Sequence, residues 1–435
     1  MLHRPSIVAG IIATLLAYHP HPAHATLLSA PGAPQAQAAP ISPAQGKIDE
    51  GLKGLRAGDL KAAEAAFAEA ARSDPKLPSA YIGLAEVAGR QNNVAQVESW
   101  LQKALDAEPN SAATQLVWGH YQFQRGRFVK AETAFKRAIE LDARSAQARI
   151  YLADNYLRGL QKPKAAEEAY RAAIALGADS VPAQLGLASA LAVQGRFDPA
   201  VAAFEQAAKL APTDPKPPHA LARFYASQGK SDLALAALQR SNTIAPDFLP
   251  AHIDRGDLHL ARNEVEQAAN AYRAGAQATK KPALALFKLG TVRQGQQRWP
   301  EAEQAYLDAV KDDPMMFAAY NNLAFMAATR KEHLDEALVW VRKAMTLAPG
   351  VTTILDTLGW VHRARGELGP AVKALEQAVA DNPKQASFRY HLGVTYSEQG
   401  RHPQARAALE KALELDKNFY MAADVKKRLQ QIASK

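Results

Sequence analysis

The segment that decides the fold is residues 181–214, VPAQLGLASALAVQGRFDPAVAAFEQAAKLAPTD. Its apolar and small residues recur three, four and seven positions apart, which is the spacing of one face of an α-helix. Gly195 divides the stretch into two such runs, where a left-handed residue can end the first helix. Pro212 follows the second run, because a helix cannot easily continue through proline. The segment therefore predicts two amphipathic helices joined by a short turn.

The same template returns every 34 residues from Ala44 onward. Eleven units of 34 residues account for residues 44–419, apart from one extra residue near position 161 and one near position 331. The 34-residue repeat therefore accounts for almost the whole chain. The units begin at Ala44, Pro78, Ala112, Ala146, Val181, Pro215, Leu249, Ala283, Phe317, Thr352 and Ala386.

Small and large residues alternate in a fixed order within each unit. Ala200 and Ala207 stand at the 20th and 27th positions of the fifth unit, where a short side chain lets neighbouring helices approach closely. Phe204, at the 24th position, fills the space that the alanines leave. Eleven registered copies of this pattern resemble the tetratricopeptide repeat family. The resemblance implies an all-α, right-handed superhelical solenoid of helix-turn-helix repeats, with the first helix of each repeat lining a concave face.

The two ends of the chain differ from the repeats. Residues 1–25 have an early basic residue, an apolar run too short to span a bilayer, and the small-x-small triplet Ala23-His24-Ala25, which together predict a secretory signal peptide. The alternative is a short uncleaved anchor. Residues 26–43 are rich in proline and alanine and predict a linker. Residues 420–435 predict a C-terminal capping helix, which the open end of a solenoid requires.

The composition excludes several kinds of site. The chain has 435 residues and no cysteine, which excludes disulfides, Cys-ligated zinc and thiol catalysis. Its formal charge is +9, and cleavage after residue 25 would leave +8 because only Arg4 is lost. This mild excess of positive charge permits an acidic partner. Without a stripe of basic and aromatic residues, and with secretion expected, we expect no nucleic-acid partner.

The sequence predicts neither an enzyme nor a bound cofactor or metal. No phosphate-binding loop or convergent catalytic set is visible. His252 and His259 are seven residues apart and could share a helix face, but a metal site would need tighter convergence. His362 falls at a helix-packing position. Carboxylate pairs such as Glu167-Glu168 are expected to be exposed and solvated.

A candidate binding surface lies in the last three repeats. Positions 2, 5, 9 and 12 of each first helix share one stripe, and the family resemblance implies that this stripe faces the concave groove. In repeats 9–11 the stripe and its neighbours combine aromatic rings with amide and charged groups, as interface hot spots do. The alternative is that these aromatic rings pack between repeats. The predicted partner-binding residues are Asn321, Asn322, Phe325, Asp356, Trp360, Arg363 and Tyr390.

Two short segments carry a second resemblance. Residues 320–325, YNNLAF, and residues 355–361, LDTLGWV, are similar to a pattern in bacterial envelope repeat proteins of exopolysaccharide and PEP-CTERM (exosortase) systems. The resemblance implies a periplasmic or secreted scaffold of a Gram-negative bacterium that binds a protein or peptide segment in its concave groove. It would serve polysaccharide export or protein sorting. A carbohydrate-binding accessory protein for an acidic polymer is the alternative, and its binding should weaken strongly with salt.

Overall fold

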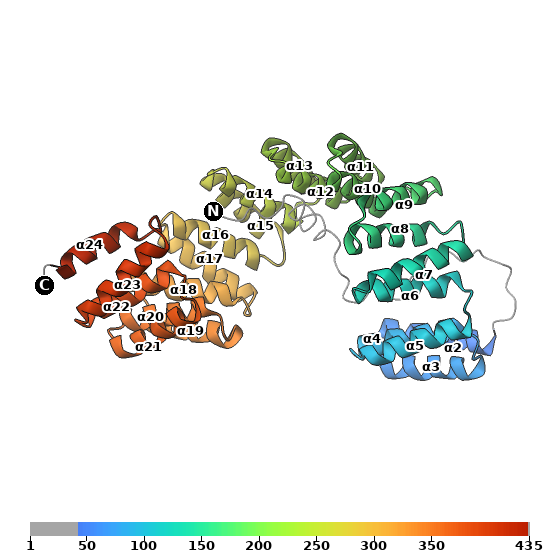
Figure 1. Ribbon diagram of the computed structural model, residues 1–435, viewed down its shortest axis with the longest axis horizontal. Helices are drawn as coiled ribbons and strands as arrows, with labels where there is room; N and C mark the ends of the chain where they lie inside the picture. The colour runs from blue at the N-terminus through green and yellow to red at the C-terminus, as the bar shows by residue number, and fades with distance from the viewer. Residues whose placement is uncertain (1–41, 434–435) are drawn as a thin grey trace. The chain divides into compact units, whose positions relative to one another are not determined.

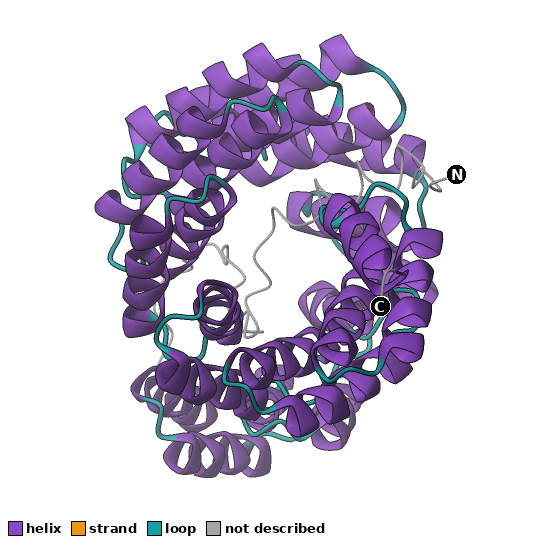
Figure 2. Ribbon diagram, turned by 90° about the vertical axis from the view of Figure 1, so that its left-hand side faces the viewer, coloured by secondary structure: helices purple, strands orange, loops and turns teal. Residues whose placement is uncertain are grey.

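The computed structural model describes residues 42–433 of the chain. The predicted signal peptide and all but the last two residues of the predicted linker lie outside this range. All regular structure in the described range is helical, with no strand (Figure 2). The chain divides into two compact units, Met1–Ile244 and Ala245–Lys435. The all-α repeat architecture expected from the sequence is confirmed.

The first unit contains six consecutive helical hairpins (Figure 1). The two helices of a hairpin pack against each other, and each hairpin packs against the next within the unit. The helices are α2 (Pro43–Ala57), α3 (Leu60–Ser73), α4 (Pro78–Arg90), α5 (Val94–Ala107), α6 (Ala112–Gln124), α7 (Phe128–Leu141), α8 (Ala146–Asp154) with its continuation η1 (Asn155–Gly159), α9 (Pro163–Ala175), α10 (Val181–Val193), α11 (Phe197–Leu210), α12 (Lys216–Ser227) and α13 (Ser231–Ile244).

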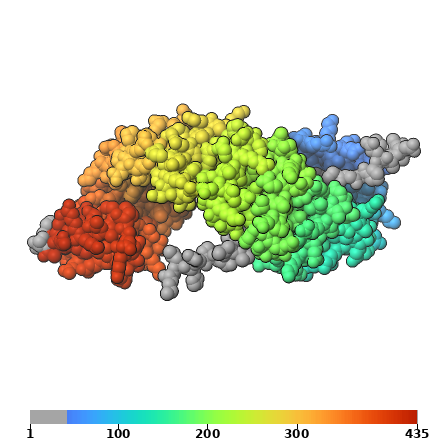
Figure 3. Space-filling view, turned by 90° about the horizontal axis from the view of Figure 1, so that it is seen from above, coloured from blue at the N-terminus to red at the C-terminus, as the bar shows by residue number. Residues whose placement is uncertain are grey.

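The second unit contains five hairpins and one further helix, with the same packing between sequence neighbours (Figure 1). In the space-filling view the colour changes gradually along each unit, because every repeat lies beside the repeats that precede and follow it (Figure 3). The helices are α14 (Leu249–Ala261), α15 (Val265–Ala278), α16 (Ala283–Gly295), α17 (Trp299–Asp312), α18 (Phe317–Arg330), α19 (Leu334–Leu347), α20 (Thr352–Ala364), α21 (Leu368–Asp381), α22 (Ala386–Glu398), α23 (His402–Leu415) and α24 (Ala422–Ala433).

Close helix contact inside a hairpin depends on a small residue opposite a ring. Tyr306 at the 24th position of repeat 8 is fully buried against Gly290 of the preceding helix. A Cβ added at Gly290 would lie only 2.7 Å from the Tyr306 ring, so a larger side chain would force the two helices apart. The alternation of small and large residues in the sequence therefore sets the distance between α16 and α17.

The turn between the two helices of a hairpin is left-handed. Gly126 and Gly366 have φ of 70° and 80°, a conformation that glycine adopts without a steric cost. Asn92, Asn263 and Gln297 adopt a φ near 60° at equivalent turns that lack glycine. The repeat therefore fixes the turn conformation even where its preferred residue is missing.

The extra residue predicted near position 161 is accommodated by a local change of helix type. Helix α8 widens into the π-helical turn η1, in which the Leu160 amide donates to the Asn155 carbonyl at 2.9 Å. A π-turn holds one more residue than an α-turn, which is how helices absorb a single insertion. Gln161 then takes a left-handed conformation with φ of 53° before α9 begins. Repeat 4 thus keeps its packing despite its greater length.

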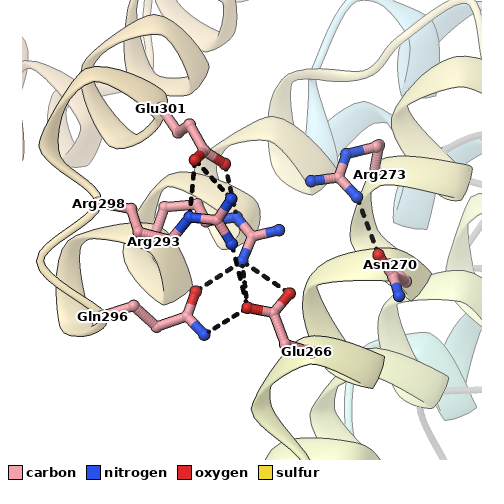
Figure 4. Close-up of polar contacts among 7 residues, drawn as sticks. All are labelled: Glu266, Asn270, Arg273, Arg293, Gln296, Arg298 and Glu301. Carbon is pink, nitrogen blue, oxygen red and sulfur yellow. Dashed lines mark hydrogen bonds and ion pairs between the residues drawn. The ribbon is translucent and has the colours of Figure 1, made fainter.

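A buried arginine joins three helices of the second unit. Arg293 on α16 is only 2% exposed and stands at a position that is apolar in several other repeats. Its Nη1 lies 3.0 Å from Glu266 on α15 and 2.6 Å from the Gln296 side-chain oxygen, and its Nε lies 3.1 Å from Glu301 on α17 (Figure 4). A buried charge is tolerated only with such partners. The pKa of Glu266 is lowered, mainly because Arg293 donates a hydrogen bond to it.

The C-terminal helix α24 covers the last repeat. Val425 is buried, and Met421, Leu429 and Ile432 pack against the same hydrophobic cluster. None of the described helices is long and apolar enough to cross a membrane.

Candidate functional site

The seven predicted partner-binding residues lie on three helices of the second unit. Helix α18 carries Asn321, Asn322 and Phe325, helix α20 carries Asp356, Trp360 and Arg363, and helix α22 carries Tyr390. These are the first helices of three consecutive hairpins, and α20 packs against both of the others. The spacing of three and four residues puts Asn321 and Phe325 on one face of α18, whereas Asn322 lies beside that face. The same spacing puts Asp356, Trp360 and Arg363 on one face of α20.

Trp360 is the centre of this arrangement and is largely buried. Only 7% of the residue is exposed, and its ring centroid lies 4.3 Å from that of His391 on α22. The indole N–H donates a hydrogen bond to Thr329 Oγ1 of α18 at 3.1 Å. Trp360 therefore connects all three helices. This is the arrangement that the alternative interpretation, packing between repeats, describes.

A buried histidine–aspartate pair lies beneath the Trp360 ring. Asp356 is 5% exposed and His391 is 2% exposed. Nδ1 of His391 lies 2.8 and 2.9 Å from the two Asp356 carboxylate oxygens. Both groups are thus satisfied by each other and are closed to a ligand.

His391 is not among the binding residues predicted from the sequence. Its position in the sequence could have indicated its role: His391 follows Tyr390 directly and lies 35 residues, one repeat and one residue, after Asp356. That offset places His391 on the side of α22 that faces α20. An ionisable residue at this position needs a partner from the preceding repeat, because it is buried there.

Arg363 and Tyr390 also make contacts within the protein. The Arg363 guanidinium lies 4.1 Å from the Trp360 ring centroid and forms an ion pair with Glu398. The Tyr390 hydroxyl donates to Asp424 of α24 at 2.8 Å. Burial, followed by this hydrogen bond, raises the pKa of Tyr390. The capping helix therefore occupies the repeat 11 part of the predicted surface.

The open part of the predicted surface is on α18. Asn322 donates to the Tyr306 hydroxyl at 3.1 Å and is thereby fixed. Neighbouring Asn321 is half-buried, and its side-chain oxygen has no hydrogen-bond partner. Phe325 is also half-buried, with its ring centroid 5.8 Å from that of His391. Asn321 and Phe325 are one helical turn apart, and we refer to these two residues as the α18 face.

Asn321 and Phe325 offer a hydrogen-bond acceptor and an apolar ring. An unpaired amide oxygen can accept a hydrogen bond from a backbone N–H, and a half-buried ring can take an apolar side chain. The histidine–aspartate pair and the Trp360 indole hold the three helices in a fixed arrangement beneath these two groups. A rigid support of this kind reduces the loss of conformational freedom on binding.

The other histidines considered from the sequence are separately engaged. His252 Nε2 lies 2.8 Å from the Pro246 carbonyl oxygen, and burial lowers the pKa of this histidine. His259 Nδ1 pairs with Glu264 at 2.6 Å, and His362 Nδ1 pairs with Glu367 at 2.5 Å. Among residues 42–433 there is no group of three His, Cys, Asp or Glu side chains that could hold a metal ion.

Of the carboxylate pair Glu167-Glu168, which was expected to be exposed, Glu167 is buried. Glu167 is only 9% exposed. Arg196 donates to both of its oxygens at 2.7 and 2.8 Å, and Arg171 donates at 3.0 Å. Although burial alone would raise the pKa of Glu167, hydrogen bonds from Gln194 and the two arginines lower it. The expectation of an exposed side chain is therefore wrong for Glu167, because the helix places it toward the next repeat.

Two family profiles match the chain, and both are described as tetratricopeptide repeat. One matches residues 116–159, 155–215, 287–351 and 357–418. The other matches residues 55–117. Together the matches fall in both units and cover more than half of the chain.

Curated relatives match shorter stretches. Cellulose synthase operon protein C of Xanthomonas axonopodis pv. citri (strain 306) is 30% identical over 175 residues, which are 38% of this chain and 12% of that protein. Tetratricopeptide repeat protein 6 of Homo sapiens is 24% identical over 216 residues, which are 49% of this chain and 41% of that protein. The chain spans less than half the length of these relatives.

Solved structures are similar at low sequence identity. A tetratricopeptide repeat protein from Parabacteroides merdae ATCC 43184 is 21% identical with a TM-score of 0.44, over 57% of this chain and 98% of that chain. A chain of the APC/C hetero-tetramer Cut9-Hcn1 is 17% identical with a TM-score of 0.42, over 89% of this chain and 96% of that chain. From its repeats and the profiles that they match, the chain belongs to the tetratricopeptide repeat family, whose repeats are scaffolds for protein–protein interaction.

Proposed function

We propose that this protein is a non-enzymatic scaffold that holds a segment of a partner protein on the α18 face, Asn321 and Phe325. The observation that carries the proposal is the unpaired, buried side-chain oxygen of Asn321. A buried acceptor without a partner costs about 1–3 kcal/mol. A ligand N–H that reaches this oxygen after a small side-chain rotation would remove that cost. Nearby, Phe325 offers a half-buried ring to an apolar side chain.

The surrounding contacts favour a protein ligand over a small charged one. Around the α18 face, the ionisable groups of Asp356, His391 and Arg363 are each paired within the protein. What remains for a ligand is an amide oxygen and apolar surface, which suit a peptide backbone and an apolar side chain. The α18 face is thus proposed to bind one backbone N–H and one apolar side chain of its partner.

Site-specific crosslinking tests this proposal. The photoreactive residue p-benzoylphenylalanine is placed at position 325, and in a matched chain at position 339 on α19, where Val339 is 66% exposed. We expect one partner protein to be crosslinked from position 325 and not from position 339. The Asn321→Ala change should reduce that product about fivefold or more, as expected for one lost hydrogen bond. Equal crosslinking from both positions would contradict the proposal.

We further propose that the scaffold works in the bacterial cell envelope, in polysaccharide export or protein sorting. The secretory pattern of residues 1–25 and the similarity to a protein named for a cellulose synthase operon support this placement. Fractionation of the source cells tests the location, with recovery among periplasmic or secreted proteins as the expected result. Recovery only among cytoplasmic proteins would refute it. A deletion strain that exports normal amounts of polysaccharide and sorts its surface proteins normally would refute the pathway.

The alternative function, binding of an acidic polymer, rests on the net charge of +8 that remains after residues 1–25. Such binding would be driven by charge and should weaken strongly between about 10 and 150 mM salt, because the screening length falls from about 30 to about 8 Å over this range. Binding on the α18 face uses an amide and a ring and should change little over the same range. A salt titration with polygalacturonate and with the crosslinked partner therefore separates the two functions.

A further inference from the structure

The first unit has a hollow that is separate from the proposed α18 face. It measures about 550 Å³ and lies on the third hairpin, formed by α6 and α7. Gln115 and Trp118 line it from α6, and the remaining lining residues come from α7. These residues belong to repeat positions that do not form the concave stripe. The hollow is therefore a different surface of the repeat.

The floor of the hollow is an aromatic ring. Trp118 is half-buried, and its ring stacks on Tyr121 at a centroid distance of 5.8 Å and an interplanar angle of 27°. Ala134 of α7 lies beside it in the lining. At the same repeat position, the fifth hairpin has Leu187. A large ring with one side open to a hollow is the kind of group that anchors a partner's apolar side chain.

The rim of the hollow carries more positive than negative charge. Lys130, Lys136 and Arg137 line it together with one carboxylate, that of Glu140. All four residues are exposed. Arg137 pairs with Glu140 at 3.0 Å, and Lys136 pairs with Glu132 at 2.7 Å. Exposed pairs of this kind exchange partners easily, so a ligand carboxylate can compete for these cations.

A second hollow in the same unit has a helical wall that the hollow on α6 and α7 does not have. The hollow at the fifth hairpin, of about 480 Å³, is lined by three helices, with Arg171 and Ile174 of α9 forming one wall. At the third hairpin no residue of the preceding helix α5 lines the hollow. Trp118 packs on one side against the hydrophobic cluster that contains Val97 and Leu101 of α5, but toward the hollow it lacks the helical wall that α9 supplies at the fifth hairpin.

We propose that the hollow on α6 and α7 is a docking site for an acidic amphipathic helix of a partner protein. Such a helix would take the place of the missing wall and put an apolar residue on Trp118. Lys130 and Arg137 are seven residues apart on α7, a rise of about 10.5 Å. Carboxylates at positions i and i+7 of the partner helix match this separation, with the apolar residue at i+3 or i+4 between them.

The exposed residue Val129 extends the same surface. It is 69% exposed and shares a helix face with Thr133 and Lys136, which line the hollow. An exposed valine beside a cationic rim adds apolar contact area at one end of the site. The cationic rim, the Trp118 ring and the open side of the hollow thus all favour an acidic amphipathic helix as the ligand.

The test uses the full chain and a designed probe. The probe is a fluorescently labelled 14-residue amphipathic peptide with leucine at its central apolar positions and glutamate at i and i+7, compared with a matched peptide that has glutamine there. Binding is followed by fluorescence anisotropy in low salt. We expect the glutamate peptide to bind about 2- to 30-fold more tightly than the glutamine peptide, which is the range that two exposed carboxylate–cation contacts give.

Variants of the chain locate the binding. The charge-reversed pair Lys130→Glu and Arg137→Glu should weaken the glutamate peptide about tenfold or more. The matched control, Lys164→Glu and Lys209→Glu, changes the net charge equally at exposed positions outside the hollow and should bind normally. Trp118→Leu, which installs the residue found in the fifth hairpin, should also weaken binding without unfolding the chain.

Three results with the two peptides and the chain variants would overturn the proposal. They are equal affinity for the two peptides, an equal loss in both charge-reversed pairs, and normal binding by the Trp118→Leu chain. Binding of oligogalacturonate that depends on Lys130 and Arg137, with no such dependence for the peptide, would also overturn it and point to an anionic sugar. Asn321→Ala should leave peptide binding unchanged, so this test is independent of the α18 face.

Discussion

Replacing Trp360 with alanine should destabilise the second unit strongly, although sequence analysis predicted a role for this residue in binding. Trp360 is 7% exposed, with its ring on His391 and under Arg363. Removing a buried tryptophan side chain costs about 3–5 kcal/mol from lost burial and the cavity left behind. The lost hydrogen bond to Thr329 adds little, because Thr329 is exposed and water can replace the indole.

Urea unfolding, followed by circular dichroism, measures this cost. With a slope of about 2–3 kcal/mol per molar urea, the Trp360→Ala change should lower the unfolding midpoint by roughly 1–2 M. Val339→Ala is the matched control, because Val339 is 66% exposed in the same unit and should shift the midpoint very little. If the two variants unfolded at the same urea concentration, Trp360 would not hold the repeats together. Its ring would then be available to a ligand.

Three further changes test the packing and the electrostatics of the second unit. Gly290→Ala should destabilise by about 1–3 kcal/mol in urea unfolding, because its Cβ would meet the Tyr306 ring at 2.7 Å; an unchanged midpoint would contradict the close contact. Arg293→Leu should change stability little, because its partners Glu266 and Glu301 are about half exposed and water can solvate their carboxylates once the arginine is gone; a large loss would show that the ion pairs are required. Burial alone would raise the pKa of Asp424, but hydrogen bonds from Arg428 and Tyr390 lower it in the folded chain. The ionised carboxylate therefore stabilises the fold at pH values above its ordinary pKa of 3.8, and this stabilisation is lost as the pH falls through the lower pKa of the folded chain. The stability difference between the wild type and Asp424→Asn should therefore shrink below about pH 4, and a difference that stays constant down to pH 2 would refute this assignment.

The fold follows closely from the sequence because each repeat carries its own local signals. Gly126 and Gly366 mark turns, and the small residue opposite Tyr306 sets the distance between two helices. The extra residue near position 161 was also visible as a break in the period. The π-helical turn that absorbs it lies slightly earlier, at Asn155–Gly159.

The division of the chain after Ile244 could not be predicted. The 34-residue register continues through this position without interruption. The fixed residues of the repeat lie between neighbouring helices, both within one hairpin, as Tyr306 does against Gly290, and between one hairpin and the next, as Tyr170 does against Gly186. Close contacts of this kind occur on both sides of Ile244, so they do not mark the place where the chain divides.

The candidate site was predicted only in its outline. The stripe spacing placed Trp360 and Tyr390 on neighbouring helices, but it could not show how deeply each is buried. Trp360 is buried partly because the His391 ring packs against its indole. Tyr390 is buried partly because its hydroxyl donates a hydrogen bond to Asp424 of the C-terminal helix. Both partners come from residues one repeat or more away, and a single repeat contains no information about them.

The most direct test of the central claim is the affinity of the purified partner segment for the Phe325→Ala chain, measured by titration calorimetry. Val339→Ala serves as the control, and the urea midpoint of each variant shows that it is folded. If the α18 face holds the partner, Phe325→Ala should weaken binding about tenfold or more, as expected for losing roughly 1.5 kcal/mol of apolar burial, while Val339→Ala binds normally. Equal affinities of the wild type and a folded Phe325→Ala chain would contradict the account.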